Sequence, residues 1–183
     1  MVFRDLYAGE IEVRVSMAKE TGVQLLLYKD SRVDQTILDE TVGPMNWQRH
    51  HTRENANCIV SIWDDRKEQW IAKEDTGTES NTEKEKGLAS DSFKRACFNW
   101  GIGRELYTAP FIWIPAEGCK ELKKNDKGKW QCFDNFAVER IKIENKKIVG
   151  LSIVNLKSGQ RVFTYVDPIW NAEQVAKKAA EAK

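Results

Sequence analysis

The segment EKGLASDSFKRACFNWGIGRELY, residues 85–107, combines a helical pattern with a two-glycine ending. An apolar stripe recurs at the spacing of one helix face: Ala89, Phe93, Ala96, Cys97 and Trp100, with Leu88 at its border. Thr82 followed by Glu85 predicts a capping box at the start of this helix. Gly101 and Gly103 predict its end after Trp100. We therefore expect a helix whose stripe packs on a sheet.

The opposite side of this helix carries mostly charged residues, namely Lys84, Asp91, Lys94, Arg95 and Phe98. Asp91 precedes Lys94 and Arg95 by three and four residues, so we expect intrahelical pairing worth a few tenths of a kcal/mol. Phe98 on a polar face predicts that another element, a subunit or a flat ligand covers it. Cations for phosphates beside an aromatic ring for bases are typical of single-strand nucleic-acid sites. A solvated face with ordinary ion pairs remains the alternative.

The chain before this helix predicts two strands, a first helix and a meander. IEVRV at 11–15 alternates in polarity, and the apolar run at 22–28 predicts a strand buried on both faces. Asp30 or Ser31 caps a helix that Gly43 and Pro44 end. Three β-like runs at 46–54, 57–64 and 68–75 have short connections, which favours an antiparallel meander.

The chain after this helix predicts further strands. Residues 104–117 show no clear period, and 117–129 form a polar, lysine-rich stretch that we expect to be a loop. Three strand candidates follow between 130 and 166, and the Ala/Lys/Glu-rich end predicts a frayed helix or disorder. The expected fold is α+β: an antiparallel meander packed on a long helix (β-β-β-α), with further C-terminal strands. We expect one domain, 1–170, and a tail, 171–183.

The overall charge gives no sign of a partner. Lysine and arginine number 29 against 28 acidic residues, so any anion site must come from local clustering. We expect no membrane span, because no window approaches about 18 apolar residues. The N-terminus lacks the apolar core of a signal peptide, which favours a cytoplasmic location.

Metal and catalytic motifs are missing from the sequence. Its cysteines, Cys58, Cys97, Cys119 and Cys132, form no C-x-x-C pair, and His50 and His51 are adjacent, so we predict no metal site and no cofactor. The sequence also lacks a phosphate-binding loop of the ATPase type, and we predict no catalytic residues.

Two alternatives to nucleic-acid binding stay open. A metal-dependent nuclease would use the acidic residues Asp64, Asp65, Glu74 and Asp75 with Lys73, but adjacent strand residues such as Lys73 and Glu74 point to opposite faces. A protein-interaction module without nucleic acid would use the seven tryptophans at core and interfaces.

The Lys-Arg-Ala helix resembles the signature helix of a known family. Asp91, Lys94, Arg95 and Ala96, followed by Gly101 and Gly103, are similar to the Rad-fifty-two/Rad-twenty-two type of single-strand annealing proteins, above all the short bacteriophage and bacterial members. Arg32, Val33, Gly43 and Trp47 are similar to that family's first helix. The resemblance covers roughly residues 20 to 110. Some members carry a further arginine where this chain has Phe98.

This resemblance implies a homo-oligomeric ring or filament that holds single-stranded DNA by its backbone. Such a protein anneals complementary strands in homologous recombination and double-strand-break repair, without ATP or bond-making chemistry, in the cytosol of a bacterial host if phage-encoded. It implies groove-floor phosphate contacts by Arg32, Lys94 and Arg95. Our further DNA-binding candidates are Phe98, Lys84, Arg49, Arg53, Lys73 and Arg104. Whether a single-strand-binding protein or an exonuclease cooperates stays open.

Overall fold

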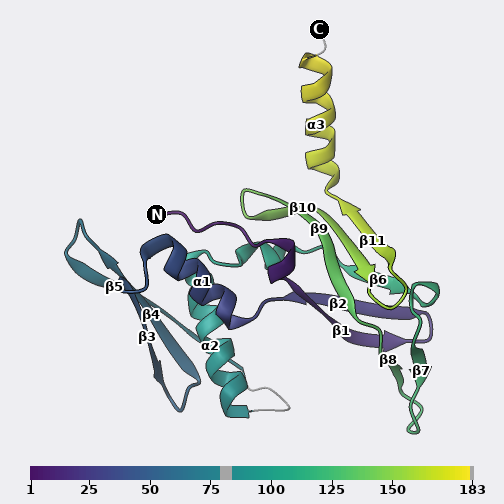
Figure 1. The fold of residues 1–183 in the computed structure, drawn as a ribbon, viewed down its shortest axis with the longest axis horizontal. Coiled ribbons are helices and arrows are strands. Elements are labelled where there is room, and N and C mark those ends of the chain that lie inside the picture. The colour runs from purple at the N-terminus through teal and green to yellow at the C-terminus, as the bar shows by residue number, and fades with distance from the viewer. Residues whose placement is uncertain (79–83, 182–183) are drawn as a thin grey trace. The chain divides into compact units, whose positions relative to one another are not determined.

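The computed structural model describes residues 1–78 and 84–181, and their contacts group them into two compact units. Unit 1 contains residues 1–5 and 29–104, and unit 2 contains residues 6–28 and the chain from 105 onward. The described residues form antiparallel sheets and three α-helices (Figure 1). The predicted α+β class is therefore confirmed.

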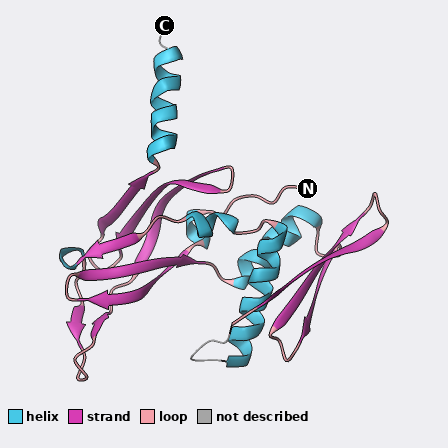
Figure 2. Ribbon diagram, turned by 180° about the vertical axis from the view of Figure 1, so that it is seen from behind, coloured by secondary structure: helices cyan, strands magenta, loops and turns pink. Residues whose placement is uncertain are grey.

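Unit 1 consists of a three-stranded meander and two helices. Its elements are α1 (Ser31–Val42), β3 (Trp47–Thr52), β4 (Asn57–Asp64), β5 (Gln69–Thr76) and α2 (Lys84–Trp100). The sheet order is β3-β4-β5, with antiparallel pairing throughout, as the sequence predicts. Both helices lie on the same side of this sheet in the two opposite views (Figures 1 and 2).

The ends of the two helices follow local sequence rules. The side chain of Asp30 caps α1 by accepting a hydrogen bond from the backbone N–H of Arg32, and Gly43 ends the helix at a φ of 84°. Gly101 ends α2 at a φ of 101°. The capping box predicted at Thr82 lies outside the described residues.

The core of unit 1 is formed by the apolar stripe of α2 packed on β4 and β5, with one aromatic contact to β3. Phe93, Ala96 and Cys97 are fully buried, and the Phe93 ring stacks on Trp47 with centroids 6.1 Å apart. The indole N–H of Trp100 donates to the carbonyl oxygen of Val60 at 3.0 Å. The predicted stripe is confirmed, because its central residues face the sheet.

A buried ion pair lies beneath the two helices. Lys29, just before α1, pairs with Asp34 on the first turns of α1, and both side chains are almost completely buried. Gly103 provides the room for the lysine, since a Cβ at this position would stand 2.4 Å from Lys29 Cε. Gly103 also has a φ of 72°, a conformation that side chains other than glycine adopt at a cost.

Unit 2 is built on a six-stranded antiparallel sheet. The order is β11 (Gln160–Val166), β10 (Lys147–Asn155), β9 (Phe136–Glu144), β1 (Glu12–Lys19), β2 (Gly22–Tyr28) and β6 (Ile112–Pro115). The predicted strands at 22–28 and between 130 and 166 are confirmed. In β2 only one face is buried, because Val23 and Leu25 are inside while Leu26 is exposed, so the prediction of two buried faces was wrong.

Two segments of unit 2 differ from the sequence-based expectation, and the last segment forms the helix that was one of its two expected states. Residues 112–115 form β6, which pairs with β2. The expected loop at 117–129 contains β7 (Leu122–Lys124), which pairs with β8 (Trp130–Cys132) in a hairpin. The end of the chain forms α3 (Pro168–Glu181), none of whose described residues is buried. None of the described helices combines the length and the apolar character needed to cross a membrane.

Two carboxylates of unit 2 are held ionised by neighbouring cations. Glu139 accepts hydrogen bonds from Arg161 at 2.6 and 2.8 Å, and this contact lowers the pKa of Glu139 from 4.5 to about 2. Asp167 accepts from Lys147 Nζ at 2.7 Å, which lowers the pKa of Asp167 from 3.8 to about 2. The first ion pair joins β11 to β9, and the second joins β10 to the residue that follows β11.

We expect Gly103→Ala to destabilise the protein more than Gly101→Ala does. Both changes force alanine into a positive φ, which costs about 1–2 kcal/mol. Only Gly103→Ala must also displace the buried Lys29 side chain, which adds about 1–3 kcal/mol, as overpacking of a core does. Urea unfolding of both variants measures the difference. Equal losses would show that Lys29 gives way freely.

We expect the free energy of unfolding to fall between pH 4.5 and about 2 as Glu139 and Asp167 take up protons. A carboxyl group whose pKa is lower in the folded state binds fewer protons there than in the unfolded state. The stability that it contributes is therefore present above its ordinary pKa and is lost as the pH falls below it. Glu139→Gln and Asp167→Asn should each flatten this fall. Arg161→Met should act like Glu139→Gln because it removes the cause. Urea midpoints at several pH values test this, and unchanged slopes would contradict it.

Candidate functional site

The first turn of α1 presents an arginine held by its own helix cap. Arg32 Nε donates to Asp30 Oδ1 at 2.8 Å and a terminal nitrogen donates to Oδ2 at 3.3 Å. The side chain of Arg32 is nevertheless 84% exposed. The cap thus orients the guanidinium while most of it stays in contact with solvent.

Lys94 on α2 comes close to the same carboxylate. The hydrogen bonds from Arg32 to Asp30, and then the charges of Arg32 and Lys94, lower the pKa of Asp30. Lys94 is half-buried, and no described residue forms a hydrogen bond or an ion pair with it. Arg32 and Lys94, 62 residues apart in the sequence numbering, therefore belong to one cationic cluster on unit 1.

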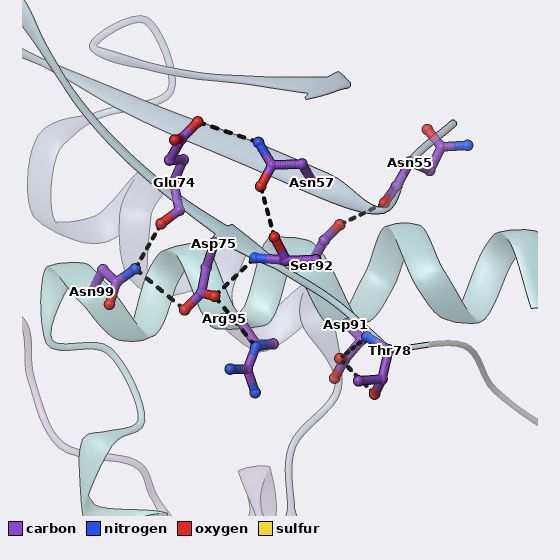
Figure 3. Close-up of polar contacts among 10 residues, drawn as sticks. Asn55, Asn57, Glu74, Asp75, Thr78, Asp91, Ser92, Arg95 and Asn99 are labelled. Carbon is purple, nitrogen blue, oxygen red and sulfur yellow. Dashed lines mark hydrogen bonds and ion pairs between the residues drawn. The ribbon is translucent and has the colours of Figure 1, made fainter. Parts of the chain in front are cut away.

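Arg95, the next residue, leans toward β5. Arg95 Nε lies 3.5 Å from Asp75 Oδ1, and the side chain is 43% exposed. Asp75 also accepts from Asn99 Nδ2 at 3.3 Å and from the backbone N–H of Thr76 at 2.8 Å (Figure 3). The inner nitrogen of the guanidinium therefore has an ion pair with Asp75 but no hydrogen-bond partner in the described part of the chain.

The expected pairing of Asp91 with Lys94 and Arg95 was wrong. Asp91 accepts instead from the backbone N–H of Thr78 at 2.9 Å and from its hydroxyl at 3.3 Å (Figure 3). Among the described residues no ion pair joins Asp91 to either cation. Asp91 thus holds the residues that follow β5 against α2.

Phe98 and Arg104 form one contact at the end of α2. The Arg104 guanidinium lies 5.6 Å from the Phe98 ring centroid. Its Nε donates to the carbonyl oxygen of Phe98 at 2.9 Å, and a terminal nitrogen donates to that of Asn99 at 3.0 Å. Arg104 therefore closes the helix and stabilises its negative end, while it covers part of Phe98.

Lys73 and Arg49 lie on the helix-facing side of the meander. Lys73 Nζ donates to the carbonyl oxygen of Asn99 at 2.9 Å and lies 4.5 Å from the Trp100 ring centroid. The Arg49 guanidinium lies 4.9 Å from the Phe93 ring centroid. These contacts give both cations a role in packing α2 on the sheet, which the sequence alone did not indicate.

The remaining DNA-binding candidates are Arg53 and Lys84. Arg53 is exposed in the turn between β3 and β4, at a φ of 51°. The side chain of Lys84, the first residue of α2, lies outside the described residues. His51 shares the helix-facing side with Arg49, and burial, then the charge of Arg49, lowers the pKa of its ring.

The acidic residues of the nuclease alternative do not come together. Asp64 and Asp75 lie at opposite ends of the paired strands, because Asp64 is opposite Gln69 and Asp75 is opposite Cys58. Asp64 caps the β4–β5 turn by accepting from the backbone N–H groups of Arg66 and Lys67. In the described part of the chain, none of these carboxylates belongs to a group able to hold a metal ion.

The carboxylates Asp30 and Asp75, which contact the candidate cations Arg32 and Arg95, were missed as site residues by the sequence reasoning. Asp30 was expected only as one of two possible helix caps, and Asp75 only as a nuclease ligand. The spacing of Asp30 and Arg32, two residues apart at a helix start, is a local signal that could have revealed the first contact. The contact between Arg95 and Asp75 has no such signal, since it forms between a helix and a strand.

Comparison of the chain with models of protein families, with curated proteins and with solved structures gives no match. The resemblance to single-strand annealing proteins therefore stays a prediction, and the function must be argued from the site itself.

We expect Lys73→Met and Lys94→Met to differ in their effect on stability. Lys73→Met removes a charged hydrogen bond to the end of α2 and a contact with Trp100, at a cost of about 1–2 kcal/mol. Lys94→Met removes no direct pair to a described residue and should cost less than about 0.5 kcal/mol. Urea unfolding separates the two, and a larger loss for Lys94→Met would make Lys94 a structural residue.

Proposed function

We propose that unit 1 binds single-stranded DNA through its phosphate backbone and promotes the annealing of complementary strands, without ATP and as part of a homo-oligomer. One observation carries the proposal. Arg32 of α1 is hydrogen-bonded to Asp30 while its side chain stays 84% exposed, and the charge of Lys94 on α2 also acts on this carboxylate, so two helices present cations near one residue. Arg95 follows Lys94 directly and is partly exposed. These three residues are also those that the family resemblance implies as phosphate contacts.

The chemistry of this cluster suits a backbone more than bases. Guanidinium and ammonium groups donate hydrogen bonds to phosphate oxygens, which are the same at every nucleotide. An annealing protein needs this kind of contact, because the base edges must stay available for the complementary strand. The near-neutral chain offers no long-range basic field, so the local cluster provides the binding.

Phe98 gives the site its aromatic member in this proposal. Its ring is half-buried and has the Arg104 guanidinium over it. It serves either as a stacking surface for a base or as a contact to the next subunit, and these two roles have different consequences when it is removed.

The oligomer in this proposal forms through the edges of the meander. Within the three-stranded sheet, β3 and β5 each pair only with β4 among the described strands. Their outer edges offer backbone groups that can pair with another chain. A head-to-tail contact between the β3 edge of one subunit and the β5 edge of the next would close a ring or extend a filament.

We expect Arg32→Ala, Lys94→Ala and Arg95→Ala each to weaken binding of single-stranded oligonucleotides and to slow annealing. Fluorescence anisotropy with a labelled oligonucleotide measures affinity, and pairing of two labelled complementary strands measures annealing. The free energy of unfolding should change by about 0.5 kcal/mol or less, as for other surface changes. Lys67→Ala, an exposed lysine in the β4–β5 turn of the same unit, is the matched control and should bind like the parent.

The salt dependence of the same variants tests the mechanism. With about three phosphates neutralised per subunit, log K against log[salt] should have a slope of roughly −2 per subunit engaged, and each single variant should reduce its magnitude by about 0.7. Affinity of the parent unaffected by salt would rule out backbone binding.

Phe98→Ala should weaken binding with the particle mass unchanged if the ring stacks on bases, and should reduce the particle mass in light scattering if it lies between subunits. Variants that fold, assemble and anneal like the parent would overturn the proposal.

A further inference from the structure

Two cysteines and an aspartate of unit 2 come together at the base of the hairpin formed by β7 and β8. The hairpin itself is labelled in Figure 1. Cys119 follows the short turn at 116–118, Cys132 ends β8, and Asp134 comes two residues later. One ligand atom from each, the two sulfurs and a carboxylate oxygen, lies within 4.8 Å of the others. The spacing of these residues matches no metal motif, which is why the sequence predicted no site.

The carboxylate of Asp134 has one buried oxygen without a partner among the described residues. The residue is only 6% exposed. Its Oδ2 accepts from the backbone N–H groups of Lys120 at 2.7 Å and Glu121 at 3.2 Å, and Cys132 Sγ lies 3.5 Å away. Its Oδ1 is buried and has no hydrogen-bond partner. An unpaired carboxylate oxygen in the interior is costly, so such an atom calls for a ligand.

The charges around the cluster also favour a cation. No lysine or arginine in the described part of the chain forms an ion pair with Asp134. A divalent cation would supply this missing counter-charge, and it would deprotonate the thiols that bind it.

We propose that Cys119, Cys132 and Asp134 bind one divalent cation of the zinc class. Two thiolates select a soft or borderline metal over magnesium or calcium, and a carboxylate is a common third ligand of tetrahedral zinc. The fourth position is left to water. The cation would close the hairpin at its base and thereby stabilise it. This site is independent of the function proposed for unit 1.

A disulfide between Cys119 and Cys132 is the competing use of the same sulfurs. It would leave Asp134 Oδ1 without a partner. The metal accounts for all three residues, whereas the disulfide accounts for two.

Cobalt binding tests the proposal on the full-length protein after treatment with a chelator and a reductant. Co²⁺ should bind at one equivalent, with thiolate-to-metal absorption in the near ultraviolet and the visible bands of a tetrahedral site, and Zn²⁺ should remove both. Cys119→Ser and Cys132→Ser should lose the thiolate absorption. Asp134→Asn keeps an oxygen for the Lys120 and Glu121 N–H groups, so it should fold and bind cobalt at least about tenfold more weakly. Cys58→Ala, which changes a buried thiol of unit 1, is the control and should bind like the parent.

A second measurement needs no variant. Zn²⁺ should protect Cys119 and Cys132 from alkylation in the parent protein, with the modified residues identified by mass spectrometry, and it should raise the thermal midpoint. Cobalt bound without thiolate absorption, or alkylation of both cysteines regardless of zinc, would overturn the proposal. A Cys119–Cys132 disulfide that forms in the absence of reductant, in a protein that binds no metal after reduction, would do the same.

Discussion

The buried ion pair between Lys29 and Asp34 is the constraint on which unit 1 depends. It joins the residue that precedes α1 to the inner face of that helix, and its lysine stem fills the space beside Gly103 at the end of α2. Burial, followed by the charge of Asp34, raises the pKa of the Cys97 thiol, so the core of α2 borders the same pair. Either partner alone would be an uncompensated buried charge, which folded proteins rarely accommodate. Both helices that carry the candidate site are therefore positioned around one interaction.

Regular periodicity made the larger elements predictable. The apolar stripe of α2, the Asp30 cap of α1 and the turns of the meander are local signals, and local energetics was enough to place them. The strand β6 and the hairpin of β7 and β8 were missed because each is only three or four residues long. Such strands owe their existence to a partner distant in sequence or to a turn such as the one at Gly128, and not to their own alternation.

The candidate site was predictable in its residue types but not in its pairings. Nothing in the sequence distinguishes Lys73, which holds the end of α2, from Lys94, which no described residue pairs with directly. Arg104 likewise closes a helix, and Asp91 binds a backbone N–H group in place of the cations one turn ahead. The choice of partner for a charged side chain depends on which backbone ends lie near it after folding, and helix ends compete strongly for cations. The cluster of Cys119, Cys132 and Asp134 was missed for the same reason.

The carboxylates beside the proposed phosphate contacts set how such a site can work. Asp30 already binds Arg32, and Asp75 already faces Arg95, so a phosphate must compete with a carboxylate for each guanidinium. This competition keeps both side chains oriented in the free protein, and it also limits the affinity of a single subunit for DNA. Strong binding then requires many subunits to engage one strand, because linked weak contacts multiply. A weak contact at each subunit also lets a strand shift and test its register against a complement, which tight binding at each phosphate would prevent. Under the proposed function, the near-neutral charge of the chain is thus compatible with annealing and is not an argument against DNA binding.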